Sequence, residues 1–354
     1  MAVENRTEQQ VLGLIERVKA KPLRFRDEQV TMAHGAGGKA TLALIEGLLA
    51  PAFGLEELAD AAVVGDVALT TDSFVVKPIR FPGGSIGELA VNGTVNDLAV
   101  AGARPLALTL SLVLEEGLTA DDLRAEVEAI ARTASAAGVA VVAGDTKVVE
   151  RGHCDSMYVT TTGIGRIDDR ARLSPGSLRP GDRVLVSGPI GEHGIAIMLA
   201  RGEFELEAPV ESDMRSLWPA VDALLDAAGD SLRCIRDATR GGVASVVNEL
   251  ARASGVAIVV RERDVPVSPA VTGACEILGL DPMYVANEGT LLAFVAPEAA
   301  ESACEALRSV AGHKQAAVIG EVKAEPPGLV LVETAFGGRR VMDLLVGDPL
   351  PRIC

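Results

Sequence analysis

The sequence has no long apolar run, no cluster of basic residues and no paired cysteine motif, and each absence excludes a class of protein. Its longest apolar stretches, such as 137–143 and 291–296, are far shorter than the roughly 20 residues of a membrane-spanning helix. The net charge of −16 comes without any run of Lys and Arg, whereas phosphate binding along a nucleic acid needs concentrated positive charge. We therefore expect no membrane span and no nucleic-acid partner.

The cysteines are widely spaced and form no C-x-x-C pair, which argues against a zinc site or a redox couple. Four of them are typical of reduced, buried core residues: Cys154, Cys234, Cys275 and Cys304. Cys354 differs because no residue follows it. The polar segment 1–30 lacks the apolar core of a secretion signal, so we expect a cytoplasmic protein.

A chain of 354 residues that is 48% apolar can form two domains with substantial cores. Predicted strands and helices alternate up to residue 167 and again from 183 to 332, which indicates an α/β fold. The turn-rich segment after residue 167 separates the two units. The predicted division is an N-terminal extension with a helical stripe at 11–18, two domains and a C-terminal tail, at 1–30, 31–167, 168–335 and 336–354.

A glycine-rich loop precedes a predicted helix at 40–49, which we expect to end at Pro51. The backbone N–H groups of such a loop and the helix dipole attract phosphate oxygens. The loop is not a Walker A motif, which would need a glycine at position 33 and a hydroxyl residue at position 40. A simple glycine turn that caps the helix is the alternative. The candidate phosphate-binding residues are His34, Gly35, Gly37, Gly38 and Lys39.

Carboxylates recur at the ends of the predicted strands of the first domain, at Asp66, Asp72, Asp97 and Asp145. Mg²⁺ prefers such hard oxygen ligands and binds phosphates together with one or two carboxylates. Each aspartate alone could instead be a cap or turn residue. The four acids and the glycine loop together indicate binding of a metal and a nucleotide.

The second domain repeats this pattern before a predicted helix at 242–253, where Asp237 and four candidate ligands precede or begin the helix: Thr239, Arg240, Gly241 and Gly242. A guanidinium at such a place neutralises phosphate charge. Glu288 lies in the short segment Asn-Glu-Gly, which is also typical of an ordinary turn.

The chain ends in Pro351, Arg352, Ile353 and Cys354, with a second proline at 349. Two prolines favour an extended chain, and a few extended residues at roughly 3.3 Å each could carry the terminal sulfur into a distant pocket. Prenylation is excluded because it needs three residues after the cysteine. A cysteine without function at this place is the alternative.

Together these motifs resemble those of the hydrogenase maturation carbamoyl dehydratases, the HypE family. The glycine loop and the acids are similar to those of a wider superfamily that includes aminoimidazole ribotide synthetase, selenophosphate synthetase and thiamine phosphate kinase. The Pro-Arg-Ile-Cys ending resembles the HypE members alone. The resemblance covers 31–354 and adds Asn96, in the motif Asn96-Asp97-Leu98, to the candidate nucleotide-binding residues.

The resemblance implies a two-domain α/β (α+β) fold of the aminoimidazole ribotide synthetase type. Its N-terminal sheet would form a homodimer, ATP would lie between the domains, and a flexible tail would follow the C-terminal α/β domain. A HypF-like carbamoyltransferase would load Cys354. The product cyanide would pass to a HypC–HypD-type scaffold that builds the iron centre of a nickel-iron hydrogenase.

The residues suggest how such a chain could dehydrate a carbamoyl group on Cys354. The carbamoyl oxygen would take the γ-phosphoryl of ATP, with Mg²⁺ on the four aspartates and the glycine-loop backbone spreading the charge. Glu288, with an ordinary or slightly raised pKa, would take protons from nitrogen. Lys147 would hold the carbamoyl oxygen or a phosphate, or else form a purely structural pair with Glu288.

Two other functions remain open from the residues. The chain could be a kinase or synthetase of the same superfamily that acts on a free small molecule, with the tail irrelevant. It could also be a scaffold that binds ATP without hydrolysing it and docks its tail on a partner.

Overall fold

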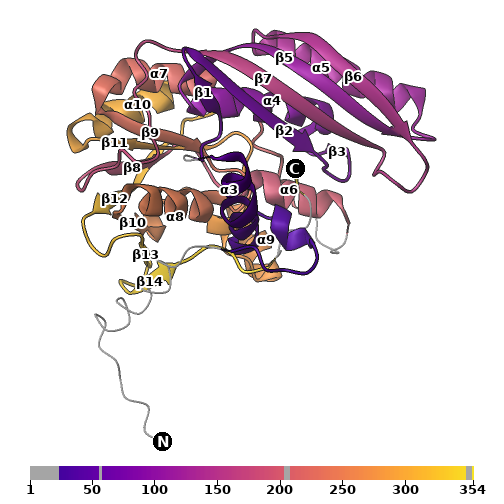
Figure 1. The fold of residues 1–354 in the computed structure, drawn as a ribbon. Coiled ribbons are helices and arrows are strands. Elements are labelled where there is room, and N and C mark those ends of the chain that lie inside the picture. The colour runs from indigo at the N-terminus through magenta and orange to yellow at the C-terminus, as the bar shows by residue number, and fades with distance from the viewer. Residues whose placement is uncertain (1–23, 56–57, 203–207, 348–352) are drawn as a thin grey trace, which may run out of the picture.

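The computed structural model describes residues 24–55, 58–202, 208–347 and 353–354. The predicted helix at 11–18 lies outside them. Two units account for most of the described chain, residues 62–167 and 183–342, and each is built on one large sheet (Figure 1). No helix in these described parts has the length and apolar character needed to cross a bilayer.

The first unit is a five-stranded sheet with the order β1-β2-β7-β5-β6, in which only β5 and β6 are parallel neighbours. Helices α4 and α5 cover one face, and a small hairpin, β3 and β4, precedes α4. The elements are β1 (Ala62–Val64), β2 (Val67–Phe74), β3 (Arg80–Phe81), β4 (Gly84–Ser85), α4 (Ile86–Val100), β5 (Ala103–Glu115), α5 (Ala120–Ala136), β6 (Ala140–Val149) and β7 (Met157–Ile167).

The two helices of this unit have different surroundings because their sequences differ. Helix α5 is amphipathic and begins at Thr119, whose hydroxyl accepts a hydrogen bond from the Asp122 N–H at 3.0 Å. Helix α4 is apolar on all sides and nearly every residue is buried, since it lies between its own sheet and the second unit. Two polar residues of α4, Asn96 and Asp97, therefore face the second unit at the joint.

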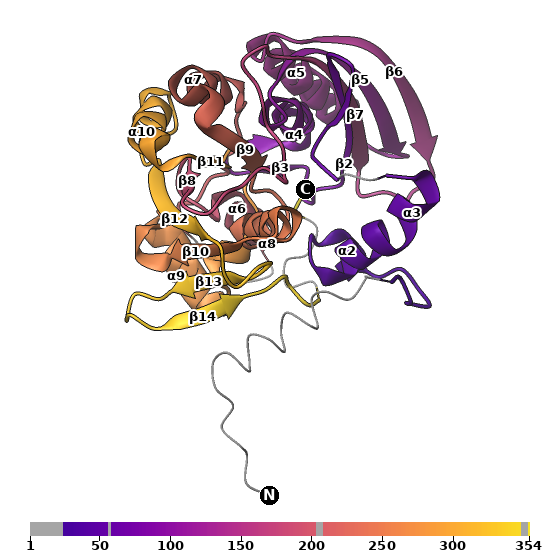
Figure 2. The same ribbon diagram turned by 60° about the vertical axis from the view of Figure 1, so that its left-hand side comes forward.

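The other face of the first sheet is uncovered within the described residues (Figure 2). On β2, Leu69, Thr71 and Ser73 are exposed while Ala68 and Phe74 are buried against α4. Strand pairing places their neighbours on the same side. We call this surface the open face; it carries Leu69, Thr71, Ser73, Thr109, Ser111, Asp145, Lys147, Thr160, Thr162 and Ile164.

The second unit is a seven-stranded sheet with the order β14-β13-β10-β12-β8-β11-β9. Helix α8 packs on one face, and α7 and α10 pack on the other. The elements are β8 (Arg183–Val186), α6 (Glu192–Ala200), α7 (Trp218–Ala228), η3 (Gly229–Ser231), β9 (Leu232–Asp237), α8 (Gly242–Ser254), β10 (Ala257–Arg261), η4 (Glu262–Asp264), α9 (Pro269–Leu278), η5 (Pro282–Tyr284), β11 (Leu291–Val295), η6 (Pro297–Ala299), α10 (Ala300–Ser309), β12 (Ala317–Lys323), β13 (Val330–Glu333) and β14 (Arg339–Met342).

The glycine-rich segment forms a series of short helices that packs on the second unit. The sequence predicts it as part of the first domain, 31–167. The prediction that its helix ends at Pro51 is wrong, because a wider turn at Ile45–Leu49 leads into a further helical turn that accepts the proline near its start. Figure 2 shows these helices beside α8. They are η1 (Met32–Gly35), α2 (Lys39–Leu44), η2 (Ile45–Leu49) and α3 (Ala50–Phe53).

The predicted tail, 336–354, contains a strand of the second sheet. Residues Arg339–Met342 form β14, which pairs antiparallel with β13 through a turn that includes Gly337, where φ is +83°. The sequence does not predict this strand as part of the second domain, because the strand is short and follows two glycines. The two predicted α/β units are confirmed, each built on its own sheet.

Candidate active site

Four aspartates lie close enough together at the joint between the units to raise one another's pKa values, and we call them the acid cluster: Asp60, Asp72, Asp97 and Asp237. Burial raises the pKa of Asp97 well above its ordinary value, and the neighbouring carboxylates of the cluster raise it further. Burial and Asp60 raise the pKa of Asp237 to about 8. Buried acids that raise one another's pKa values either retain protons or attract a cation.

Two arginines face the acid cluster. Arg236 Nε lies 3.1 Å from Asp60 Oδ2, and its Nη2 donates to Glu249 at 3.1 Å. Arg240 Nη2 lies 3.9 Å from Asp72 Oδ1, while its Nη1 donates to the Gly35 carbonyl at 3.1 Å. These cations offset part of the negative charge, and Arg240 offers donors to an anion at the edge of the cluster.

Glu288 is buried beside the acid cluster, and Asp213 fixes its backbone. The Asp213 carboxylate accepts hydrogen bonds from the N–H groups of Glu288 and Gly289 at 2.9 and 3.0 Å, and from the Thr290 hydroxyl at 2.9 Å. A side chain at Gly289 would collide with the Asp213 carbonyl, only 1.9 Å from an added Cβ. Burial, then Asp237, raises the pKa of Glu288 well above its ordinary value, and not slightly as the sequence suggested.

The last two residues enter the same region. Ile353 is 4% exposed and belongs to the apolar cluster between the units. Its carbonyl accepts a hydrogen bond from His193 Nε2 at 2.7 Å. Burial raises the pKa of the Cys354 thiol to about 12; Arg240 lowers it, while Glu288 and Asp72 raise it. The sulfur therefore lies among these groups as a neutral thiol.

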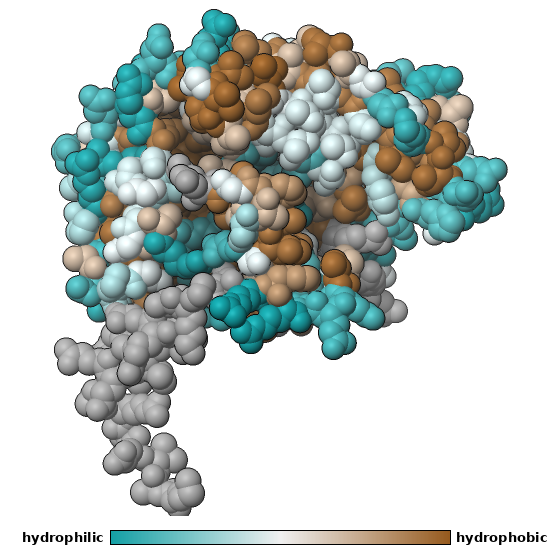
Figure 3. Space-filling view, in the orientation of Figure 1, coloured by the Kyte–Doolittle hydropathy of each residue, from teal (hydrophilic) through white to brown (hydrophobic). Residues whose placement is uncertain are grey.

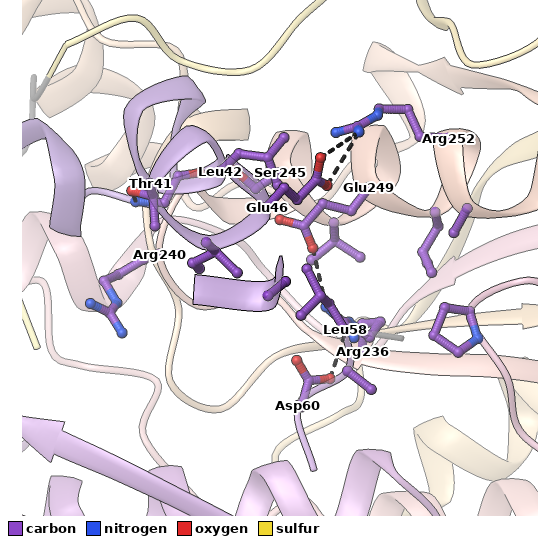
Figure 4. Close-up of a pocket in the computed structure, with 18 of the residues that line it drawn as sticks. Thr41, Leu42, Glu46, Leu58, Asp60, Arg236, Arg240, Ser245, Glu249 and Arg252 are labelled. Carbon is purple, nitrogen blue, oxygen red and sulfur yellow. Dashed lines mark hydrogen bonds and ion pairs between the residues drawn. The ribbon is translucent and has the colours of Figure 1, made fainter. Parts of the chain in front are cut away.

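A cleft of about 1270 Å³ opens between the glycine-loop helices and α8 (Figure 4). Asp60 and Arg236 lie at its inner end, and the ion pair of Glu46 with Arg252, at 2.9 Å, spans its outer part. Apolar side chains complete the wall, among them Leu42, Ile45, Leu55 and Leu58. The cleft thus combines an apolar wall with a charged end, as a nucleotide requires.

The glycine loop packs tightly against the N-terminal end of α8. Gly37 has a φ of +74°, and an added Cβ would lie 2.6 Å from the Arg240 carbonyl. At Gly38 the same atom would lie 2.6 Å from the Leu345 carbonyl. The Gly37 carbonyl accepts a hydrogen bond from Ser245 at 2.8 Å. Glycine is required here because the backbones approach so closely.

Comparisons with known proteins agree with this geometry. The family description "AIR synthase related protein, N-terminal domain" matches residues 58–167, and "AIR synthase related protein, C-terminal domain" matches 179–332. The carbamoyl dehydratase HypE of Rhodobacter capsulatus is 48% identical over 339 residues, which cover 93% of this chain and 99% of that protein. The chain belongs to the HypE family of carbamoyl dehydratases.

Solved structures of HypE proteins are similar to this family member over most of its length. A HypE–HypF complex has a TM-score of 0.82 and 44% sequence identity, and covers 86% of this chain and all of that one. A HypE structure in complex with ATP has a TM-score of 0.78 and 43% identity, and covers 92% of this chain and all of that one.

In this HypE-family chain, many of the predicted site residues lie at the joint or along the cleft. The structure gathers Asp72, Asp97, Arg240, Glu288 and Cys354 around the joint, as their pKa perturbations show. Five predicted nucleotide-binding residues line the cleft: His34, Gly35, Gly37, Thr239 and Arg240. Gly38, Gly241 and Gly242 shape the backbone around them, the last two with φ of +79° and +60°.

Three predicted site residues lie elsewhere in the single chain. Asp66 is exposed beyond β1 and sits 3.8 Å from Arg166. Asp145 and Lys147 pair with each other on the open face, the opposite side of the sheet from Asp72. Strand pairing also puts Asp145 three strands from Ser73, about 14 Å away. One chain therefore does not bring these three residues to the acid cluster.

Other predicted ligands make internal contacts. Asn96 donates to the carbonyls of Arg215 and Glu288 at 2.9 and 3.1 Å and accepts from the Leu217 N–H at 2.8 Å, so its amide joins the two units. His34 Nε2 lies 3.0 Å from Asp27, and Lys39 forms an ion pair with Asp343 at 2.6 Å. Their assignment to the nucleotide stays a prediction.

Sequence reasoning missed Asp60, Asp213 and His193, and it gave Asp237 no separate role. Asp237 was visible as the acid before Thr239. His193 had a weak signal, since it is one of 4 histidines and lies in an otherwise apolar stretch after Gly191. Asp60 and Asp213 had none, because only the folded chain brings them to the site.

Proposed function

We propose that this chain is an ATP-dependent carbamoyl dehydratase whose substrate is a carbamoyl group on the sulfur of Cys354. The observation that carries the proposal is the placement of Ile353 between the units, with Cys354 among Arg240, Glu288 and Asp72. The name of the Rhodobacter capsulatus relative supports the reaction. The product is an S-cyanate, which supplies cyanide for the iron of a nickel-iron hydrogenase.

ATP binds in the cleft between the glycine-loop helices and α8. The apolar wall formed by Leu42 and Leu58 suits the base, and Arg240 and the glycine loop suit the phosphates. A related HypE structure was solved in complex with ATP, which supports this assignment.

The acid cluster fits Mg²⁺, which binds with one or two carboxylates, retained waters and phosphate oxygens. Within the described residues no three acidic, cysteine or histidine side chains converge on one point. The ion would therefore depend on the nucleotide for part of its coordination. Mutual repulsion among the buried acids supports a cation here, with Asp72 and Asp97 as its first ligands. Mg²⁺ would supply charge neutralisation for the phosphates.

The residues of the chain divide the remaining chemistry. ATP supplies the phosphoryl group that turns the carbamoyl oxygen into a leaving group. The nitrogen must then lose both protons while the C–O bond breaks and the C–N triple bond forms. Glu288 accepts one proton from nitrogen, and the departing phosphate carries away the other. Its raised pKa makes the carboxylate a stronger base once it is ionised, and Arg240 is the nearby cation that favours ionisation.

The site disfavours a free thiolate, and this suggests when each step occurs. With a pKa of about 12, the docked Cys354 thiol stays neutral and is a weak nucleophile. A carbamoylated sulfur carries no charge and fits the same place. We infer that the sulfur is loaded outside the joint by a HypF-like carbamoyltransferase and is dehydrated inside it. The HypE–HypF complex supports that partner.

The open face is the proposed homodimer surface. It exposes Leu69 and Ile164 by 41% and 37% among threonines and serines, and no described element covers it (Figure 3). In such a dimer Asp145 and Lys147 lie in the interface, and Lys147 acts on the site of the second copy. We further propose that the protein is cytoplasmic and passes cyanide to a HypC–HypD-type scaffold.

Mass spectrometry of the C-terminal peptide tests the proposal. After incubation with a carbamoyl donor system and ATP, carbamoylation of Cys354 should appear first, and the loss of one water should then require ATP. Glu288→Gln should retain ATP binding and carbamoylation but not lose water, at least a 100-fold reduction in rate. Normal turnover by this variant contradicts the assigned base.

Deletion of Cys354 separates the alternatives. A kinase of a free small molecule keeps its activity without this residue, whereas the dehydratase loses it. A non-catalytic scaffold binds ATP but leaves it intact even when the carbamoyl donor is present.

A further inference from the structure

His193 holds the last peptide of the chain inside the joint. It is the second residue of α6 and is fully buried, with its ring edge-on to Phe81 at 5.6 Å. Its Nε2 contacts the Ile353 carbonyl at 2.7 Å, and its Nδ1 contacts the Ser212 hydroxyl at 2.8 Å. Neither the motifs nor the catalytic roles given above use this histidine.

The hydrogen-bond network fixes which nitrogen carries the proton. The Ser212 oxygen accepts the Met214 N–H at 3.2 Å, so its own proton is free to go to Nδ1 of His193. Nδ1 is then an acceptor, and Nε2–H donates to the Ile353 carbonyl. Burial lowers the pKa of His193, which keeps the ring neutral and in this form.

The Ile353 side chain is a second point of attachment. It lies in the apolar cluster between the units, which also includes Phe81 and Ile195, and it is as buried as a core residue. Hydrogen bonding of the carbonyl and burial of the side chain restrict the residue that precedes Cys354. The sulfur is then one residue away from a fixed backbone.

The loop that supports His193 also supports the base. Ser212 orients His193, and the next residue, Asp213, holds the backbone of Glu288. The loop itself is tied to the first unit, because the Ser212 N–H donates to the Pro82 carbonyl at 2.9 Å. Two adjacent residues thus set the position of the sulfur carrier relative to the proton acceptor.

We propose that His193, oriented by Ser212, is a positioning residue that docks the Ile353 peptide and so places the sulfur of Cys354 opposite Glu288. The proposal rests on the proposed function for its role in dehydration. Docking of the tail is independent of that function and can be measured in the unloaded chain.

Alkylation of Cys354 by iodoacetamide measures docking, because the docked thiol is hindered and neutral. In His193→Leu we expect the initial rate at pH 8, followed on the C-terminal peptide, to rise about fivefold to tenfold, the value of one hydrogen bond. His193→Gln keeps a side-chain N–H donor and should return the rate to within about twofold of wild type. His153→Gln, a change in an exposed histidine, should leave the rate unchanged.

Two milder variants cover the case in which His193→Leu does not fold, which thermal unfolding reveals. Ser212→Ala removes the proton donor that orients the ring, and Ile353→Ala shortens the anchor on the tail itself; both should raise the alkylation rate about threefold or more. Unchanged rates in all folded variants overturn the proposal.

The loaded chain connects docking to the reaction. His193→Leu and Ile353→Ala should slow the ATP-dependent loss of water by about tenfold or more, because a misplaced sulfur reacts slowly even while the tail is docked, and His193→Gln should restore the rate. If wild type never loses water, the proposed function fails while the alkylation result still decides docking. If water loss is normal in the folded variants, the positioning role fails and the proposed function stands.

Discussion

Replacing Asp237 by asparagine should stabilise the free protein, and the gain should grow with pH. The pKa of Asp237 is raised from 3.8 to about 8 by burial and by Asp60. Between these values the folded chain retains a proton that the unfolded chain has lost, so stability falls as pH rises from about 4 through about 8. Asparagine stays neutral throughout and avoids this loss.

The magnitude follows from the pKa difference. About four units at about 1.4 kcal/mol each set an upper bound near 6 kcal/mol. Asp60 and Asp97 titrate together with Asp237 and share the effect, so we expect about half of that bound, roughly 3 kcal/mol, above pH 8. Arg236 retains its ion pairs with Asp60 and Glu249 in the variant.

Urea unfolding at pH 5, 6, 7, 8 and 9, followed by the fluorescence of the single tryptophan, Trp218, measures this difference. The free energy of unfolding of Asp237→Asn should exceed that of wild type by a margin that widens up to about pH 8 and then levels off. Asp230→Asn, a change in an exposed acid before the same strand, should show no such margin. A margin that is independent of pH, or a variant less stable at every pH, refutes the reasoning.

Three further substitutions test other contacts. Asp213→Asn should lower the free energy of unfolding by about 3 kcal/mol in the same urea assay, because the new amide NH₂ group would face N–H groups that the carboxylate now accepts. A loss below about 1 kcal/mol contradicts the assigned hydrogen bonds. Gly289→Ala should cost about 2 kcal/mol or more, whereas Gly273→Ala, which faces open space, should be neutral or stabilising. Ile164→Glu should convert a dimer to a monomer in light scattering, whereas Ile277→Glu on α9 should not; a dimeric Ile164→Glu places the interface elsewhere.

The regular elements of the fold follow from local pattern. Apolar spacing and turn residues predict a strand at 157–167 and helices at 85–101 and 120–137. Strand β7 matches this prediction, and α4 and α5 lie within one residue of theirs. For β6 the same pattern predicts only a strand at 139–142, since Gly144 and Asp145 are typical of a turn. It continues to Val149 because the β-branched residues after Asp145 pair with β5.

The length of β6 also explains why a single chain does not bring Asp145 to the acid cluster. At the end of a strand Asp145 could have turned toward Asp72, but in the middle of a strand alternation sends its side chain to the open face. The two acids that join the cluster instead, Asp60 and Asp237, come from the start of one sheet and the edge of the other. Their proximity depends on the packing of the two units, which local sequence does not encode.

The amide of Asn96 gives the two units a central fastening, with bonds to Arg215, Leu217 and Glu288. These hydrogen bonds oppose a hinge motion that would separate the two units to admit a substrate. Conformational changes during the reaction would then involve the segments that pack over the joint. These segments are the glycine-loop helices and the terminal Ile353 and Cys354. The turnover rate would then depend on how fast the C-terminal peptide enters and leaves the joint, while the two units keep their relative positions.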